Sequence, residues 1–271
     1  MNRIERCFQQ LKQQGRKGFV AYIGAGDPTL DVTVDLVIAL ADAGADVVEL
    51  GVPFSDPLAD GLVNQLSAQR ALEAGADVPG VLRAIQQIRA RGCEVPICFF
   101  TYFNPIYHYG LERFAQDASS AGADGILTLD VPVEEGSEYV KPFRENGLST
   151  IFLIAPTSSD ERIAKIVERT SGFIYYVSRA GVTGERTELA VGVKEQIERV
   201  RRHSGLPIAV GFGVSTPEQA RLTASMGDAV VVGSAIVRHI AEGDGSAEHV
   251  AAVAEFVRTL ADAAHASEPT Q

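Results

Sequence analysis

Residues 45–61 read ADVVELGVPFSDPLADG. The first part of this stretch, 46–51, is short and mostly apolar and leads into a Gly- and Pro-containing loop, which is typical of a β-strand buried on both faces. One carboxylate, Glu49, lies inside the apolar run. A buried carboxylate must be neutralised, paired or used in chemistry, because burying an isolated charge is costly. Glu49 is therefore the first candidate functional residue.

The same pattern of a short apolar run, a loop and a segment of helical period occurs eight times along the chain. Runs that are apolar throughout suit parallel strands covered by helices on both faces. Eight successive β/α units predict an α/β fold of the (β/α)8 TIM-barrel type. An open doubly wound sheet is the alternative, although it usually has fewer strands and one clear switch point. The predicted strands are 18–24, 46–51, 96–102, 124–130, 150–156, 173–178, 207–213 and 228–233.

Helix-boundary signals separate these strands. Ser158 with Glu161 and Ser215 with Glu218 have the spacing of a capping box, and Pro217 suits the first turn of the second helix. The tetrapeptide Ala-Gly-Ala-Asp precedes predicted strands at 43–46 and 121–124 but also occurs at 74–77, where no strand follows. It is therefore weak evidence for repeated units.

No Ser/Gly-rich linker or break in composition divides the 271 residues, which predicts a single TIM-barrel domain over 1–271. Apolar side chains at i, i+3, i+4 and i+7 near the start predict an N-terminal helix within 1–15 that caps the barrel. The last residues, 266–271, are mostly polar, and we expect a disordered tail there.

The composition of the chain limits which binding partners and which cellular compartment we expect. The net charge of −11 argues against a nucleic-acid or anionic-membrane surface, since such partners need a basic footprint. The three cysteines Cys7, Cys93 and Cys98 have no CxxC or metal-site spacing and fit reduced thiols. No apolar run approaches the roughly 20 residues of a membrane helix. We expect a soluble, cytoplasmic protein.

Glycine-bearing loops follow the last three predicted strands. They contain Thr183 and Gly184, then Gly211 and Gly213, then Gly233 with Ser234. In TIM barrels the active site lies at the C-terminal ends of the strands, and the loops after the last strands often bind phosphate through backbone N–H groups. An ordinary tight turn would explain any one glycine. Three such loops in succession favour a phosphate site, with 182–184 as a closing lid.

The C-terminal ends of the predicted strands lack the residue types that two common kinds of enzyme mechanism need. None of the five lysines lies at the C-terminal end of a predicted strand, so a Schiff-base mechanism lacks its nucleophile. The five histidines form no ligand cluster there, so we expect no metal. Carboxylate acid/base chemistry remains, with Glu49 raised in pKa by desolvation and Asp60 ionised on its loop. From residues alone, a structural hydrogen-bond role for Glu49 and a turn or cap role for Asp56 and Asp60 stay open.

Residues 49–61 closely resemble the signature of the tryptophan synthase alpha subunit family. Four more segments match this family in order and extend the resemblance over nearly the whole chain: 26–28 (GDP), 130–132 (DVP), 178–184 (SRAGVTG) and 211–214 (GFGV). The resemblance implies a TIM-barrel lyase of tryptophan biosynthesis that cleaves indole-3-glycerol phosphate into indole and glyceraldehyde 3-phosphate by a retro-aldol reaction.

The resemblance also implies roles for individual residues. Glu49 would be the general acid/base, Asp60 would hydrogen-bond the indole N–H, and Tyr175 would lie beside the reacting hydroxyl. Asp56 and Thr183 would take part in loop closure and communication between subunits. The indole pocket would comprise Tyr22, Phe100, Leu127 and Phe212. The phosphate would be held by Gly184, Gly211, Gly213, Gly233 and Ser234.

The family's alpha subunit binds no cofactor and pairs with a beta subunit that carries pyridoxal phosphate, so the resemblance implies that partner. A stand-alone lyase that releases indole, and a mainly regulatory subunit, are the alternatives. Two residues depart from the family pattern. Leu62 replaces a usual proline, and Asn64 replaces an aliphatic residue at the indole pocket. A polar Asn64 there would need a hydrogen-bond partner if it is buried.

Overall fold

Parallel β-strands form a closed barrel in the computed structural model, which describes residues 1–177, 186–211 and 213–267. Nine strand segments form one sheet in the order β5-β4-β3-β2-β1-β9-β8-β7-β6. The two end segments, β5 (Ser149–Ile151) and β6 (Leu153–Ile154), are separated only by Phe152. They are halves of one interrupted strand, because β5 pairs with β4 and β6 pairs with β7. The ring therefore has eight strands, and the TIM-barrel prediction is confirmed.

Each predicted strand is present, most of them trimmed by a few residues at one or both ends. The predicted runs were too long because residues in the flanking loops continued the apolar runs beyond the residues that form backbone hydrogen bonds in the sheet. The remaining strands are β1 (Gly18–Gly24), β2 (Val47–Gly51), β3 (Ile97–Thr101), β4 (Gly125–Thr128), β7 (Ile174–Val177), β8 (Ile208–Gly211) and β9 (Ala229–Val232).

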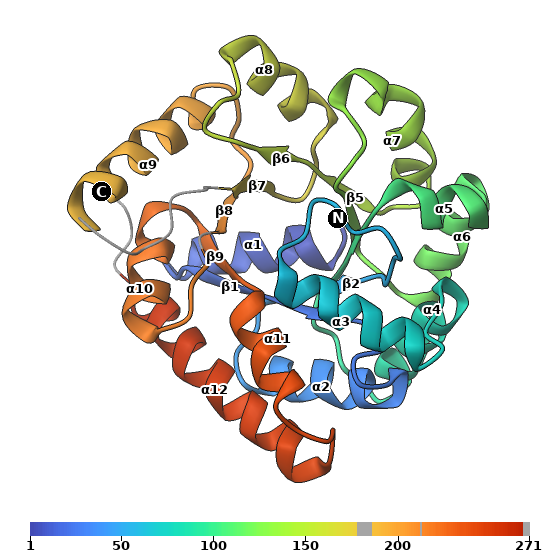
Figure 1. Cartoon of the computed structure of the whole chain (residues 1–271). Coiled ribbons are helices and arrows are strands. Elements are labelled where there is room, and N and C mark those ends of the chain that lie inside the picture. Colours follow the sequence, from blue (N-terminus) through green and yellow to red (C-terminus); the bar gives the residue numbers. More distant parts are fainter. Residues whose placement is uncertain (178–185, 212, 268–271) are drawn as a thin grey trace.

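Helices surround the strands on the outside of the barrel (Figure 1). They bury the outward-facing strand residues, which explains why the strands read as nearly continuous apolar runs. Besides the N-terminal helix, they are α2 (Leu30–Asp42), α3 (Leu62–Glu73), α4 (Val78–Ala90), α5 (Phe103–Tyr109), α6 (Leu111–Ala121), the 3-10 turn η1 (Val133–Glu135), α7 (Gly136–Glu145), α8 (Asp160–Arg169), α9 (Arg186–Arg201), α10 (Pro217–Met226), α11 (Ser234–Ala241) and α12 (Ala247–His265).

The N-terminal helix α1 (Arg3–Gln13) closes the N-terminal end of the barrel. Its buried face, Ile4, Phe8 and Leu11, belongs to the same apolar cluster as the inward-facing residues of the strands. Figure 1 shows α1 lying across the middle of the ring, behind the strands. The capping helix is thus confirmed, and a capping box at Asn2 sets its first turn.

Two other helix starts differ from the prediction by one residue. The side chain of Ser159, not Ser158, caps α8, and Thr216, not Ser215, caps α10. The Ser158 hydroxyl instead accepts a hydrogen bond from the Ala155 N–H. Both hydroxyl residues of each pair suit a cap, so sequence spacing alone could not choose between them.

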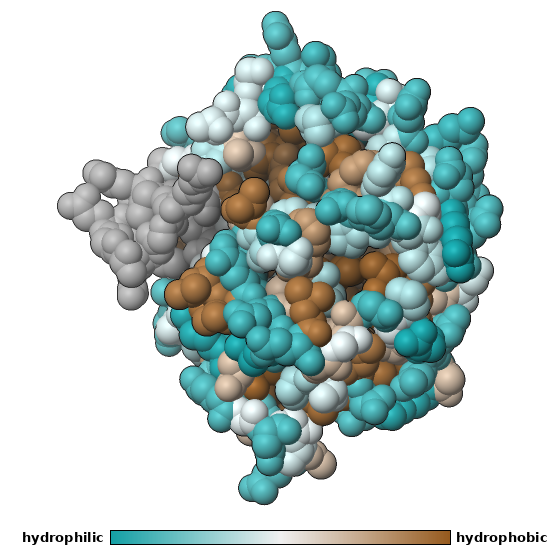
Figure 2. Space-filling model, turned by 45° about the vertical axis from the view of Figure 1, so that its right-hand side comes forward, coloured by the Kyte–Doolittle hydropathy of each residue, from teal (hydrophilic) through white to brown (hydrophobic). Residues whose placement is uncertain are grey.

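At the other end of the chain, α12 ends at His265 and the described part ends at Ser267, so most of the predicted tail lies outside the described residues. No helix in the described ranges is long and apolar enough to cross a membrane. The face drawn in Figure 2 is largely hydrophilic, with apolar atoms visible in the hollows between elements.

Candidate active site

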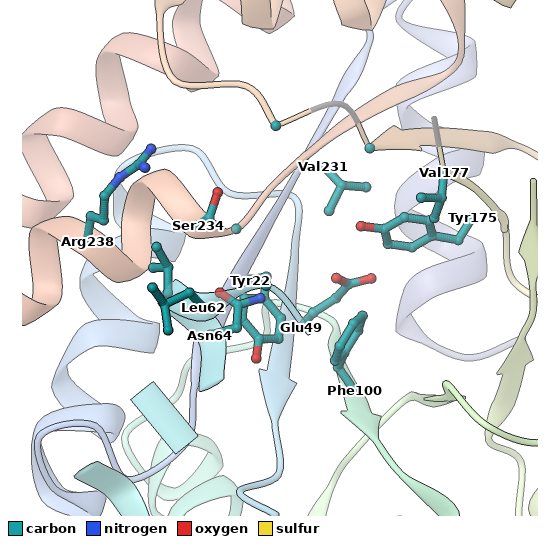
Figure 3. Close-up of a pocket in the computed structure, with 15 residues that line it drawn as sticks. Tyr22, Glu49, Leu62, Asn64, Phe100, Tyr175, Val177, Val231, Ser234 and Arg238 are labelled. Carbon is teal, nitrogen blue, oxygen red and sulfur yellow. The ribbon is translucent and has the colours of Figure 1, made fainter. Parts of the chain in front are cut away.

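A cavity of about 500 Å³ opens at the C-terminal ends of the strands, the rim that the TIM-barrel prediction singled out. It is drawn in Figure 3, where the Glu49 carboxyl and the Tyr175 hydroxyl point into the same space and Phe100 lies beside them. The lining residues are Tyr22, Glu49, Gly61, Leu62, Val63, Asn64, Phe100, Tyr175, Val177, Gly211, Gly213, Val231, Gly233, Ser234 and Arg238.

Glu49 lies in the middle of β2 and faces the barrel interior. Its neighbours in the sheet are Tyr22 on β1 and Cys98 on β3. The residue is 0% exposed, and neither carboxyl oxygen has a hydrogen-bond partner within the described part of the chain. Burial raises the pKa of Glu49 from 4.5 to about 8. Glu49 is therefore a protonated acid near neutral pH, and the alternative that it serves as a structural hydrogen-bond partner is not supported.

Asp60 follows β2 on the loop before α3 and lines a smaller hollow beside the main cavity. The Tyr102 hydroxyl donates to Asp60 Oδ2 at 2.8 Å, and Asn64 Nδ2 donates to Oδ1 at 3.4 Å. Burial raises the pKa of Asp60, and these two hydrogen bonds act in the opposite direction because they favour the ionised form. Asp60 does not cap α3, whose N-cap is Gly61 without a side-chain bond.

Aromatic rings form one wall of the cavity. Tyr22 and Phe100 pack edge to face, with ring centroids 4.9 Å apart. Tyr175 lies against Gly211, where an added Cβ would come within 2.9 Å of the Tyr175 hydroxyl oxygen, so the glycine leaves room for the ring. The predicted pocket residue Leu127 is fully buried in the barrel interior and does not line the cavity.

Glycine-bearing loops form a second, glycine-rich wall, which meets the aromatic one where Gly211 lies against Tyr175 and Gly233 lies against Tyr22. Gly211, Gly213, Gly233 and Ser234 all line it, as the phosphate prediction required. Helix α11 begins at Ser234, and its N-cap Gly233 provides no side-chain cap. The first N–H groups of a helix have no partner inside the helix, so they can bind an anion. The predicted residues Thr183, Gly184 and Phe212 lie outside the described residues.

A model of the tryptophan synthase alpha chain family matches residues 8–265. The chain belongs to the tryptophan synthase alpha chain family. The alpha chains of Opitutus terrae and Geobacter sulfurreducens are each 48% identical to it, over 93% of this chain and 94% of the relative in the first case and 97% and 99% in the second. The solved structure of tryptophan synthase subunit alpha from Legionella pneumophila superposes with a TM-score of 0.87 at 38% identity, over 97% of this chain and 99% of that chain.

Several of the lining residues had not been predicted, and Arg238 is the charged one among them. Arg238 lies one helical turn after Ser234 on α11, and it is the one cation among the lining residues that the structure describes. Its position four residues after Ser234, which the sequence predicts to hold phosphate, is the signal that could have identified it, because i and i+4 share a helix face.

Other acidic residues near the rim have different surroundings. Asp27 is buried and forms a two-pronged ion pair with Arg70, at 2.8 and 2.6 Å, which makes it structural. Asp56 is exposed and accepts a hydrogen bond from the Ser55 hydroxyl. Within the described ranges, no three His, Cys, Asp or Glu side chains come together as a metal site.

Proposed function

We propose that this chain cleaves indole-3-glycerol phosphate into indole and glyceraldehyde 3-phosphate as the alpha subunit of a tryptophan synthase, with a beta subunit that carries pyridoxal phosphate as its partner. The observation that carries the proposal is Glu49, a buried carboxylic acid that has no hydrogen-bond partner among the described residues and lines a cavity with an aromatic wall and a glycine-rich wall. Family membership over 8–265 supports the same reaction.

In the proposed reaction Glu49 gives its proton to C3 of the indole ring. This converts the ring to an indoleninium cation with its positive charge on the nitrogen, and the Asp60 carboxylate accepts a hydrogen bond from that N–H. Glu49, now ionised, takes the proton of the hydroxyl on the adjacent side-chain carbon. The bond between that carbon and C3 breaks, its electrons return to the ring, and indole and the aldehyde are formed.

The raised pKa of Glu49 supports both proton transfers, because an acid that titrates near the working pH can donate and accept in one cycle. Tyr175 lies beside Glu49 in the cavity and is assigned to the reacting hydroxyl (Figure 3). The glycine-rich wall and the start of α11 are assigned to the phosphate. Asp56 and Thr183 are assigned to loop closure and communication with the partner.

The test is indole release by the purified full chain, with and without a beta subunit, for the natural sequence and for Glu49→Gln. The substitution removes the acid/base but keeps the shape, so we expect a loss of roughly 10² to 10⁴ in turnover. Glycerol phosphate should bind as before. Glu112→Gln, on the exposed surface of α6, is the matched control and should retain full activity.

Near-normal indole formation by Glu49→Gln would exclude the proposed acid/base. Addition of the beta subunit should raise indole turnover strongly if the chain works within a complex. Full activity without that increase would favour a stand-alone lyase, and weak indole release both alone and in the complex would favour a mainly regulatory subunit.

A further inference from the structure

One side chain in the cavity wall has a buried acceptor that nothing in the described part of the chain satisfies. Asn64 is the third residue of α3, and its Nδ2 group donates to Asp60. Its Oδ1 atom is buried and has no hydrogen-bond partner among the described residues. An unsatisfied buried acceptor lowers the stability of the fold, because it has lost its hydrogen bonds to water. A ligand or water that donates a hydrogen bond to this atom would offset that loss.

A second polar group lies close to Asn64. Tyr22 and Asn64 both line the main cavity and both line the small hollow that contains Asp60. The Tyr22 hydroxyl lies against Gly51, where an added Cβ would come within 2.4 Å of the hydroxyl oxygen. The absence of a side chain at Gly51 thus leaves room for a hydroxyl group in a wall that is otherwise largely apolar.

The hollow itself is the size of one small polar group. Its free volume is about 10 Å³, close to the minimum that one water molecule needs. Asn64 Oδ1 is a pure acceptor, whereas the Tyr22 hydroxyl both donates and accepts. A single O–H group in the hollow would donate to Asn64 and accept from Tyr22. An N–H or methyl group would satisfy only one of these partners or neither.

We propose that this hollow binds a hydroxyl group on the aromatic ring of the substrate, so that the site accepts hydroxylated indoles as well as indole. The inference rests on the function proposed above, which places the indole N–H against Asp60. Because Asp60 lines the hollow, the ring edge next to the nitrogen faces it. The ring carbon at that edge is C7, so a 7-hydroxyl reaches Asn64 and a 4-hydroxyl, on the opposite edge, does not.

The experiment compares dissociation constants of indole, 7-hydroxyindole and 4-hydroxyindole for the full chain, measured by calorimetry. One added hydrogen bond predicts that 7-hydroxyindole binds about threefold to tenfold more tightly than indole. We expect 4-hydroxyindole to show no such gain. It is the matched control, because it has the same atoms and polarity and differs only in the position of the hydroxyl.

Two variants locate the effect. Asn64→Leu replaces the amide with an apolar group of similar size and should abolish the preference for 7-hydroxyindole over indole, so the ratio of the two dissociation constants is the readout, whatever the change in indole affinity itself. Tyr22→Phe removes one oxygen atom and should weaken the preference. Tyr22→Phe is also the smaller perturbation, so it keeps the test valid if the leucine variant folds poorly.

Equal affinity of the natural chain for indole and 7-hydroxyindole would overturn the proposal and would indicate that the hollow holds only water. An undiminished preference in Asn64→Leu, or an equal gain with 4-hydroxyindole, would overturn it as well. Failure of indole itself to bind would instead contradict the proposed function, so the two failures are distinguishable.

Discussion

At the N-terminal ends of the strands, aspartates accept several hydrogen bonds each, whereas at the C-terminal ends the Glu49 carboxyl is buried and has none in the described part of the chain. Asp124 is the clearest case at the N-terminal end. It accepts from the Ile97 N–H at 3.0 Å, from Arg89 at 2.9 Å and from Arg3 at 3.2 Å. Both ends belong to one barrel, so the difference lies in how each end uses its polar groups.

The arrangement at Asp124 occurs at two more strands. Asp46 precedes β2 and exchanges two hydrogen bonds with Phe19. The Asp46 carboxylate accepts from the Phe19 N–H, and the Asp46 N–H donates to the Phe19 carbonyl. Asp228 precedes β9 and forms the same pair of bonds with Ile208. In all three cases these bonds join the start of the aspartate's own strand to the strand before it in the barrel, and an arginine forms an ion pair with the aspartate.

These aspartates provide stability, because satisfied buried polar groups rigidify a fold. At the opposite end, the Glu49 carboxyl and Asn64 Oδ1 have no hydrogen-bond partner among the residues that the structure describes, which costs stability and leaves polar atoms available to a ligand. Buried polar groups without partners are uncommon in native proteins, and they concentrate where function requires them. The comparison therefore assigns stability to one end of the barrel and chemistry to the other.

The largest expected effect on stability comes from Asp124→Asn. An amide cannot accept every bond that the carboxylate accepts, and Arg89, whose side chain is only 11% exposed, would lose its buried counter-charge. Breaking a buried ion pair by removing one partner typically costs about 3–5 kcal/mol. Denaturant unfolding should show a loss of this order in the free energy of unfolding.

The matched control for Asp124→Asn is Asp77→Asn. Asp77 ends the Ala-Gly-Ala-Asp tetrapeptide at 74–77 but caps α4, and asparagine is an equally good N-cap. A similar loss of stability in both variants would show that the aspartates at strand starts have no special role.

The second prediction concerns Glu49 and pH. The pKa of Glu49 is about 8 in the folded chain and near 4.5 when unfolded. The folded state therefore holds a proton on Glu49 that the unfolded state releases. As pH rises from about 4.5 to about 8, this titration lowers the free energy of unfolding of the natural chain. Glu49→Gln removes this dependence, so its stability relative to the natural chain should rise through the same window.

The gain should be on the order of a few kcal/mol at pH 8 and close to zero below pH 4.5. Urea unfolding of both proteins at several pH values measures it, and titrations that the two proteins share cancel in the difference. A difference that stays constant with pH would mean that Glu49 is not held protonated by burial.

Sequence reasoning predicted the eight strands because each is a short apolar run, a signal contained within a few adjacent residues. It could not predict the role of Asp46, whose partners include His265, 219 positions away. The repeated tetrapeptide shows the same limit, since Asp124 joins strands and Asp77 caps a helix after identical residues. Tertiary surroundings decide the role of such a residue.

The candidate site shows the same division. Glu49 and the glycine-rich loops could be predicted, since a charge inside an apolar run and glycines after strands are local features. Arg238 lies inside α11 and not in a strand-end loop, so its spacing of four residues from Ser234 is the only local feature that points to the cavity. The open acceptor of Asn64 depends on packing and is visible only in three dimensions.

A smaller effect is expected from Arg238→Gln at the C-terminal end. If the glycine-rich wall binds phosphate, the loss of the nearby cation should weaken glycerol phosphate binding roughly fivefold, a modest change because Arg238 is exposed. Indole affinity should not change, and Arg238→Lys should retain most of the binding. Equal weakening of both ligands would indicate a general disturbance of the site.

The smallest effect on stability is expected from Asp228→Asn. This variant tests whether the stability that an aspartate provides depends on how deeply it is buried. Asp228 makes the same bonds as Asp124 to a neighbouring strand, but its side chain is 32% exposed and that of Arg201 is 40% exposed. Water can replace part of the lost interaction, so the cost should be about 1 kcal/mol, close to the value of an exposed ion pair with one hydrogen bond. Unfolding measured beside Asp124→Asn gives the ratio directly. Equal losses at the two sites would show that the shared hydrogen-bond pattern, and not burial, determines how strongly each aspartate stabilises the barrel.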